Sequence, residues 1–278
     1  MKKILVPTDF SQRAEEALDF AIQFNKKIKG KIVLMHVLDF PSGSFNTMGD
    51  IESLDPEIIY HGEFIKGVHE KLEGIKDSLN NENVDVKIKY GNPYVSISKE
   101  IAEEKVDYII MGSDGASGLK EVFIGSVAEK VIRNADCPVI VVKGSAKLND
   151  MKNFVFATDL SEEQDFIASQ AKDMQDLLDL NMHLLTVKTP HNMRREFDTK
   201  RKMEEFAKRN SIERYTTNTI DADYSDEGIV AFAEEVNAGM IIMGTHGKTG
   251  LAHIFGGSRA EDVANESKIP VMTFKIDF

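Results

Sequence analysis

The chain has 278 residues, of which 29% are charged and 42% hydrophobic, a balance typical of a water-soluble globular protein. Its net charge of −12 argues against a general nucleic-acid or anionic-membrane surface, because phosphate-rich partners favour clustered Lys and Arg. The single cysteine, Cys137, excludes an intrachain disulfide and a cysteine metal cluster, and we expect a cytoplasmic protein without a signal peptide or membrane span.

The first half of the chain alternates between two kinds of hydrophobic pattern. Short apolar runs predict strands at residues 3–7, 32–37, 84–88, 108–111 and 139–142. Helical periodicity predicts helices at residues 14–24, 57–79, 93–104 and 126–134, the first with Ser11 as its N-cap and ending near Gly30. The Gly/Ser/Asn-rich segment from Pro41 to Asp55 predicts a loop.

The same pattern restarts after a polar break at residues 144–150. Four segments recur in the same order: Phe154–Ser161 repeats Ile4–Ser11, Leu184–Val187 repeats Leu34–Val37, Met240–Gly244 repeats Tyr108–Gly112, and Ile269–Met272 repeats Cys137–Ile140. The sequence therefore predicts a duplicated domain, with residues 1–145 and 150–278 as its two copies. Strands that alternate with helices predict the α/β class, each copy being a doubly wound domain with a five-stranded parallel sheet and helices on both faces.

Each half also contains the spacing G-x2-G-x9-G-S. Its members are Gly112, Gly115, Gly125 and Ser126 in the first half, and Gly244, Gly247, Gly257 and Ser258 in the second. The first glycine follows a buried strand and the Gly-Ser pair opens a helix. Open α/β sheets bind ligands at that edge, and helix N-termini favour anions. The alternative is that the glycines only form tight turns, and the repeated spacing favours phosphate binding. Neither copy is a Walker A loop or a G-x-G-x-x-G fingerprint.

An aspartate follows the first strand of each half, Asp9 in the first and Asp159 in the second. A carboxylate at that position can accept a hydrogen bond from a ribose hydroxyl. Asp is also common near helix starts, where it caps backbone N–H groups. Both interpretations stay open at the level of sequence.

The sequence contains no recognisable catalytic or metal-binding constellation. Seven scattered histidines lack ligand spacing, and Cys137 is interpreted as a small buried residue rather than a redox group. The charged helices at residues 57–77 and 194–209 are interpreted as solvated faces. We expect no catalytic residue and no metal held by protein ligands.

The motif with its flanking strands resembles the universal stress protein family, on the segments Val6–Ser11, His36–Val37, Met111–Glu129 and Cys137–Val139. Both halves carry the resemblance, as in the tandem members of the family, and the glycine motif marks the ATP-binding subgroup. The resemblance implies that the base and ribose are surrounded by Pro7, Thr8, Asp9, Val37 and Met111. It implies that the triphosphate is held by Gly112, Gly115, Gly125, Ser126 and Val127.

The second half keeps most, but not all, of these positions. The matching residues are Thr158, Asp159, Val187, Met243, Gly244, Gly247, Gly257 and Ser258. Ala157 stands where the first half has Pro7, and Arg259 stands where it has Val127. Arg259 either reaches a phosphate or fills the pocket, and the first site is favoured if only one holds ATP.

The two loops differ in charge between their glycines. Asp114 would repel a triphosphate unless a divalent cation lay between them, so we hypothesise that the first site prefers Mg-ATP. The second loop has Thr245 and His246, with Lys248 just after the glycine, and would need metal less.

The resemblance implies an ATP-binding regulatory or stress-response module without dedicated catalysis. The alternatives are an interaction scaffold that binds no nucleotide, and a slow ATP hydrolase or nucleotidyl transferase of the same fold. In this family the last strands of two domains pair, which implies that Val139–Val142 and Val271–Phe274 form an intrachain pseudo-dimer. A further homodimer and an unidentified protein partner stay open.

Overall fold

A computed structural model of the chain describes residues 1–39, 56–79, 83–113, 124–190, 196–246 and 259–276. The strands of this part of the chain are β1 (Lys3–Pro7), β2 (Lys31–Leu38), β3 (Val84–Tyr90), β4 (Tyr108–Gly112), β5 (Val139–Val142), β6 (Asn153–Ala157), β7 (Asn181–Lys188), β8 (Tyr215–Asp221), β9 (Ile241–His246) and β10 (Val271–Ile276). The helices are α1 (Gln12–Ile28), α2 (Pro56–Ser78), α3 (Pro93–Glu104), α4 (Ser126–Asn134), α5 (Asp165–Leu178), α6 (Glu196–Arg209), α7 (Ser225–Glu235) and α8 (Arg259–Glu266), with 3-10 turns η1 (Leu148–Asp150) and η2 (Glu162–Gln164).

The predicted alternation of strands and helices is confirmed in the described residues. Ser11 is the N-cap of α1, where its hydroxyl accepts a hydrogen bond from the backbone N–H of Ala14 at 3.2 Å. Asn92 caps α3 in the same way, with Pro93 as the first helical residue. The loop predicted at residues 41–55 lies outside the described residues.

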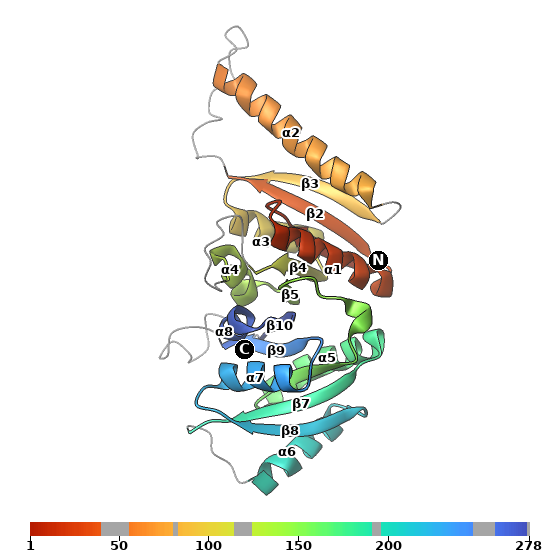
Figure 1. The fold of residues 1–278 in the computed structure, drawn as a ribbon, viewed down its shortest axis with the longest axis vertical. Coiled ribbons are helices and arrows are strands. Elements are labelled where there is room, and N and C mark those ends of the chain that lie inside the picture. The colour runs from red at the N-terminus through yellow and green to blue at the C-terminus, as the bar shows by residue number, and fades with distance from the viewer. Residues whose placement is uncertain (40–55, 80–82, 114–123, 191–195, 247–258, 277–278) are drawn as a thin grey trace.

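All ten strands belong to one sheet, in the order β3-β2-β1-β4-β5-β10-β9-β6-β7-β8. Within each half every pairing is parallel, so each half is the predicted five-stranded, doubly wound α/β domain. Figure 1 shows the two halves stacked along the long axis of the molecule, with β3 and α2 at one end and β8 and α6 at the other. The predicted fold class is therefore confirmed.

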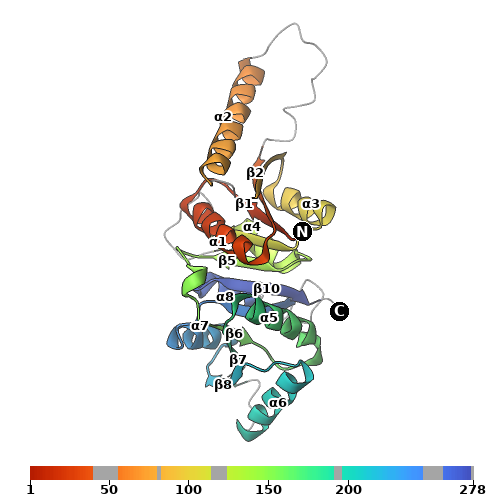
Figure 2. The ribbon, with the colours of Figure 1, turned by 90° about the vertical axis from the view of Figure 1, so that its right-hand side faces the viewer.

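The two halves join through their last strands, as the family resemblance implied. β5 and β10 run antiparallel, with Val141 opposite Val271, Ile140 opposite Met272, and Val139 opposite Thr273. Figure 2 shows these two strands side by side at the middle of the molecule. The Thr273 hydroxyl also donates to the Val139 carbonyl across the joint. The predicted intrachain pairing is thus confirmed.

Helices cover both faces of the sheet and form two hydrophobic cores. One core lies under α1, α2, α5 and α6 and includes the fully buried Phe20, Phe24, Phe154 and Phe156. The other lies under α3, α4, α7 and α8. Each core contains residues of both halves, so the apolar interior is continuous across the β5–β10 joint. This continuity follows from strands that carry apolar side chains on both faces.

The polar segment that joins the halves packs against α1. The Gln23 side chain accepts a hydrogen bond from the Leu148 N–H at 2.9 Å and donates to the Ala146 carbonyl at 3.4 Å. Leu148 itself is buried. The segment is therefore attached to the first half, and the division into residues 1–145 and 150–278 stays a proposal.

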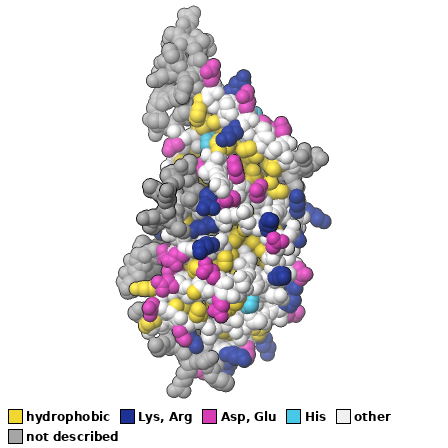
Figure 3. Space-filling model, in the orientation of Figure 1, with side chains coloured by type: hydrophobic (Ala, Val, Ile, Leu, Met, Phe, Trp, Pro, Cys, Tyr) yellow, Lys and Arg dark blue, Asp and Glu magenta, His cyan; other side chains and the backbone are white. Residues whose placement is uncertain are grey.

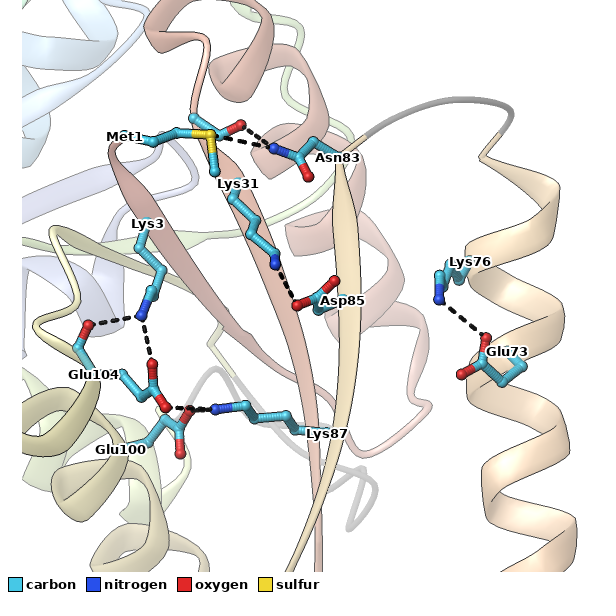
Figure 4. Close-up of polar contacts among 11 residues, drawn as sticks. Met1, Lys3, Lys31, Glu73, Lys76, Asn83, Asp85, Lys87, Glu100 and Glu104 are labelled. Carbon is cyan, nitrogen blue, oxygen red and sulfur yellow. Dashed lines mark hydrogen bonds and ion pairs between the residues drawn. The ribbon is translucent and has the colours of Figure 1, made fainter.

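A network of ion pairs connects β1, β3 and α3 near one edge of the first half (Figure 4). Glu100 is 1% exposed, and its carboxylate lies 2.6 Å from Lys87 Nζ and 3.0 Å from Lys89 Nζ. Glu104 accepts from Lys3 Nζ at 2.6 Å and from Lys87 Nζ at 3.0 Å. A buried carboxylate is tolerated only when it is paired in this way, so the lysines hold α3 against the sheet.

The network predicts a change of stability at acid pH. The hydrogen bonds from Lys3 and Lys87 lower the pKa of Glu104 from 4.5 to about 2. A depressed pKa stabilises the fold above the unfolded value, and this contribution is lost as the pH falls from about 4.5 towards 2. We expect the urea midpoint of Glu104→Gln to fall less steeply than that of the wild-type chain in this window. Parallel curves for the two proteins would contradict the assignment.

Candidate functional site

The turn after β1 is fixed by its own side chains. The Thr8 N–H donates to the Met35 carbonyl at 2.8 Å, which continues the β1–β2 pairing past the end of the strand. The Thr8 hydroxyl accepts from the Phe10 N–H at 3.1 Å, and Asp9 Oδ1 accepts from the Ser11 N–H at 3.0 Å. Phe10 has φ 63°, a left-handed conformation that costs a non-glycine residue about 1 kcal/mol or more.

The second half repeats this turn. Thr158 Oγ1 accepts from the Leu160 N–H, and Asp159 Oδ1 accepts from the Ser161 N–H, each at 3.0 Å. Leu160 has φ 67°. Asp9 and Asp159 therefore both have a structural role in the turn, while their side chains lie exposed at the edge of the sheet. One carboxylate oxygen of each aspartate therefore closes the turn before the N-cap residue, Ser11 or Ser161, and does not itself cap the helix. The ribose interpretation stays a prediction.

A third residue supports each turn from the neighbouring strand. His36 Nδ1 lies 2.7 Å from the Thr8 carbonyl oxygen, and the Thr186 hydroxyl donates to the Thr158 carbonyl at 3.1 Å. His36 and Thr186 occupy the same position in the two repeats. Neither residue was predicted to have a role, although both precede the two equivalent valines, Val37 and Val187.

The predicted base and ribose positions meet where the sheet reverses its winding. β1 lies between β2 and β4, with Pro7 opposite Met35 on one side and Leu5 opposite Ile109 on the other. The three carboxyl ends bring together Pro7, Thr8, Asp9, Val37, Met111 and Gly112. The second half brings together the corresponding ends of β6, β7 and β9, with Ala157 opposite Met243. In open α/β sheets this switch point is where ligands bind.

The first glycine of each motif has a packing role. A Cβ on Gly112 would lie 2.8 Å from the backbone of Arg13 at the start of α1. A Cβ on Gly244 would lie 2.5 Å from Ile167 Cδ1 and 2.9 Å from Ile276 Cδ1. Each glycine therefore lets a helix approach the end of a strand, which is a packing role and not the turn role that the sequence left as the alternative.

Gly125 is the N-cap of α4, and the Gly-Ser pair opens the helix as predicted. The Gly125 N–H donates to the Ser113 carbonyl at 2.7 Å, so the end of β4 and the start of α4 are joined. Among the described residues no side chain caps this helix. Ser126 is exposed and Val127 half-buried, and the first N–H groups of a helix have no intrahelical acceptor. The helix dipole adds partial positive charge at this point.

Several predicted site residues cannot be placed. Gly115, Gly247, Gly257 and Ser258 lie outside the described residues, as do Asp114 and Lys248. Arg259 is the first residue of α8 and is exposed.

The residue at the predicted base position is more deeply buried in the second half than in the first. Val187 is 7% exposed, whereas Val37 is only half-buried. α7 lies against Val187, because a Cβ on Gly228 would be 2.7 Å from Val187 Cγ1. Beyond it, at the ends of β7 and β8, an open cavity of about 400 Å³ is lined by Lys188, Thr189, Pro190, Asp221, Ala222 and Asp223.

Two further reactive side chains, Cys137 and His183, are engaged in the fold. Cys137 is buried, and desolvation raises the pKa of its thiol to about 12, so the thiolate is disfavoured. His183 lies between Asn153 and Thr216, at 3.1 and 3.0 Å, and burial lowers its pKa. In the described part of the chain no three His, Cys, Asp or Glu side chains are arranged to hold a metal ion.

None of the helices in the described ranges combines the length and the apolar character needed to cross a membrane.

Comparison with known proteins identifies the family. The sequence profile of the universal stress protein family matches residues 1–143 and again residues 151–275. The chain belongs to the universal stress protein family. The stretch between the two matches contains the segment that packs on Gln23.

Individual universal stress proteins match one or both halves. One from Methanocaldococcus jannaschii is 36% identical over 155 residues, which cover 51% of this chain and 94% of the relative. A second from the same organism is 34% identical over 148 residues, covering 52% and 84%. The crystal structure of a universal stress protein from Archaeoglobus fulgidus covers 99% of this chain and 98% of its own, with 25% identity and a TM-score of 0.76.

The packing role of the first glycines gives a stability prediction. Gly112→Ala places a methyl group against the backbone of Arg13, which cannot move away as a flexible side chain would. We expect a loss of about 1–3 kcal/mol in the free energy of unfolding, measured by urea denaturation. The control is Gly67→Ala on α2, where a Cβ meets nothing within 4 Å. That change removes a helix-interior glycine and should stabilise by about 1 kcal/mol or less. Equal effects of the two variants would contradict the close-approach assignment.

Proposed function

We propose that the chain binds ATP at the carboxyl edge of the first half and acts as a regulatory, stress-response module. The observation that carries the proposal is the coincidence of three features at one switch point. These are the exposed Asp9 carboxylate after β1, the half-buried Val37 on β2, and the Gly125-Ser126 start of α4. A base needs an apolar surface, which Val37 offers. A ribose hydroxyl needs an acceptor, which Asp9 offers, and phosphates need N–H donors such as those at the start of α4.

The proposed division of roles follows the positions in the sheet. Val37, Pro7 and Met111 would contact the base, and Thr8 and Asp9 would face the ribose. Gly112, Gly115, Gly125, Ser126 and Val127 would surround the phosphates, with Gly112 also serving the packing of α1. Lys143 follows Val142, which lies opposite Gly112 in the sheet, so an ammonium group is placed at the same edge.

The first half is the better candidate of the two. In the second half Val187 is covered by α7 and Ala157 replaces the proline of the first half. These two differences reduce the accessible apolar surface for a base. The second set, Thr158, Asp159, Val187, Met243, Gly244, Gly247, Gly257 and Ser258, is proposed as a weaker site.

The main alternative is an interaction scaffold that binds no nucleotide. The packing roles of Gly112 and Gly244 favour it, since they explain one glycine of each motif without a ligand. Slow ATP hydrolysis is a further possibility of the same site and would be seen as phosphate release. Nucleotide binding by the purified chain distinguishes the ATP-binding module from the scaffold.

The binding prediction concerns the two aspartates. Asp9→Ala removes an acceptor for the ribose hydroxyl, and we expect isothermal titration to show ATP affinity reduced about tenfold or more. Asp159→Ala is the matched variant, because Asp159 makes the same turn hydrogen bond at the same distance. We expect Asp159→Ala to leave the ATP affinity of the tighter site unchanged.

The same proteins give a simple preliminary observation. The chain has no tryptophan, so retained adenine nucleotide would clearly raise the ratio of absorbance at 260 and 280 nm. A chain that carries no nucleotide and shows no heat on titration with ATP would overturn the proposal in favour of the scaffold.

The metal prediction concerns Asp114. If Mg²⁺ lies between this carboxylate and the triphosphate, EDTA should weaken ATP binding by about fivefold, the size of one exposed charge pair. The titration uses the full chain with Asp159→Ala, so that the first site dominates. Asp114→Asn removes the repulsion and should make binding insensitive to EDTA. If the chain with Asp114 intact binds equally well after EDTA, the metal hypothesis is wrong.

A further inference from the structure

One side chain of the second half contacts the backbone of the first half beside the proposed phosphate site. Asn265, on α8, accepts a hydrogen bond through Oδ1 from the Ile124 N–H at 2.7 Å. The backbone carbonyl of the same residue accepts from Lys143 Nζ. The two contacts join residues that are 141 and 122 positions apart in the sequence.

Ile124 is the residue immediately before the N-cap of α4. Its side chain is 5% exposed and belongs to the core under α3, α4, α7 and α8. The next residue, Gly125, donates its N–H to the Ser113 carbonyl. The backbone that enters α4 is therefore held by two consecutive hydrogen bonds, one from its own half and one from the other.

The residue of the first half that is equivalent to Asn265 makes an ion pair across the joint. Arg133 lies eight residues after Gly125, as Asn265 lies eight residues after Gly257, so the two are equivalent in the repeat. Arg133 instead pairs with Glu261 through two nitrogens, with Nε 2.7 Å from Oε1. Glu261 is 7% exposed. Figure 1 shows α4 and α8 side by side between the two halves, and Figure 3 shows acidic and basic side chains gathered around this region.

We propose that Asn265 is a positioning residue of the first nucleotide site, supplied by the second half. It fixes the backbone that enters α4, and with it the direction of the first N–H groups of the helix at Ser126 and Val127, and its carbonyl also holds the Lys143 ammonium at the same edge. The inference rests on the proposed function, because it concerns the phosphate end of that site. It gives a physical reason for the two halves to be one chain: the first site is incomplete without α8.

The proposal separates the phosphate end of the ligand from the base end. Asn265 contacts the entry to α4 and Lys143, whereas the Thr8–Asp9 turn and Val37 lie at the ends of β1 and β2, further from the joint in the sheet. Its removal should therefore weaken binding of ATP and leave binding of adenosine unchanged. A general loss of structure would weaken the binding of both ATP and adenosine.

The test is a pair of titrations on the full chain with Asn265→Leu, which removes the acceptor and keeps the volume. We expect ATP affinity to fall about tenfold and adenosine affinity to change by less than about twofold. Asn265→Ser, a smaller change that shortens the side chain, should give the same result. The control is Asn134→Leu on α4, since the Asn134 amide donates within its own helix, to the Lys130 carbonyl. We expect the control to bind both ligands like the wild-type chain.

A second measurement needs no ligand. Amide exchange of Ile124, followed by NMR in the nucleotide-free chain, should be faster in Asn265→Leu and slow again in Asn265→Asp, which keeps an acceptor oxygen. The inference would be overturned if Asn265→Leu bound ATP as tightly as the wild-type chain does, or if it lost affinity for ATP and adenosine equally. If the wild-type chain binds neither ATP nor adenosine, the proposed function fails. If the Ile124 amide exchanges at the wild-type rate in Asn265→Leu, the Ile124–Asn265 hydrogen bond does not protect it and the inference fails.

Discussion

The antiparallel pairing of β5 with β10 is the constraint on which the rest of the structure depends. All four residues of β5 are buried, and so are Val271, Met272, Thr273 and Phe274 of β10. Either strand alone would be an apolar edge with unpaired N–H and C=O groups, which promotes aggregation. Pairing them satisfies both edges and extends each hydrophobic core through the joint, so neither half presents this edge to solvent.

The joint also brings together the helices that follow the two glycine motifs. α4 and α8 contact each other, and their Arg133–Glu261 and Ile124–Asn265 contacts cross between the halves. A second ion pair, Lys275 Nζ to Asp136 at 2.7 Å, ties β10 to the segment after α4. The two proposed nucleotide sites therefore lie next to the same joint. The backbone at the start of α4, in the first site, is held by one hydrogen bond from each half.

Most of the fold could be predicted because each strand and helix carries its own hydrophobic pattern. Short apolar runs gave the strands of the first half, and the repeat placed their partners in the second. The β5–β10 pairing was predicted by family resemblance. The pattern could not predict local backbone states. Lys29, not the following Gly30, takes the left-handed conformation that ends α1, and a Cβ on Gly30 would instead lie 2.4 Å from the Lys2 carbonyl oxygen.

The site was predictable in outline and not in detail. Thr8, Asp9, Val37 and Gly112 lie at the carboxyl ends of neighbouring strands, because parallel strands end at a common edge. That they surround a nucleotide stays a prediction. The sequence left open whether the aspartates cap helices or face a ligand, and the structure shows that they support turns with a left-handed residue. It also shows that Gly112 lies against the backbone of Arg13, and that Gly244 lies against the ends of the Ile167 and Ile276 side chains. Asn265 could not be found from sequence, because its contact joins segments that only the folded chain brings together.

These observations divide the glycine motif into two parts with different physical causes. The first glycine has a close neighbour in both halves, which is the backbone of Arg13 at Gly112 and the ends of side chains at Gly244. Gly125 opens α4, and the backbone that enters the helix is held by Ser113 of its own half at Gly125 and by Asn265 of the other half at Ile124. In the described part of the motif, the first turn of α4 offers backbone N–H groups to an anion. Nucleotide binding at this edge is therefore the claim that gives the motif a function beyond turn geometry.

The most direct measurement is a chemical-shift map of the full chain as ATP is added. If the first site binds the nucleotide as proposed, the largest changes will be at the amides of Val37, Asp9, Gly112, Gly125 and Ser126, with smaller changes at Asp159. Addition of adenosine will shift Val37 and Asp9 and leave Gly125 in place. Shifts confined to other surfaces, or no shifts at millimolar ATP, would contradict nucleotide binding at the switch point of the first half.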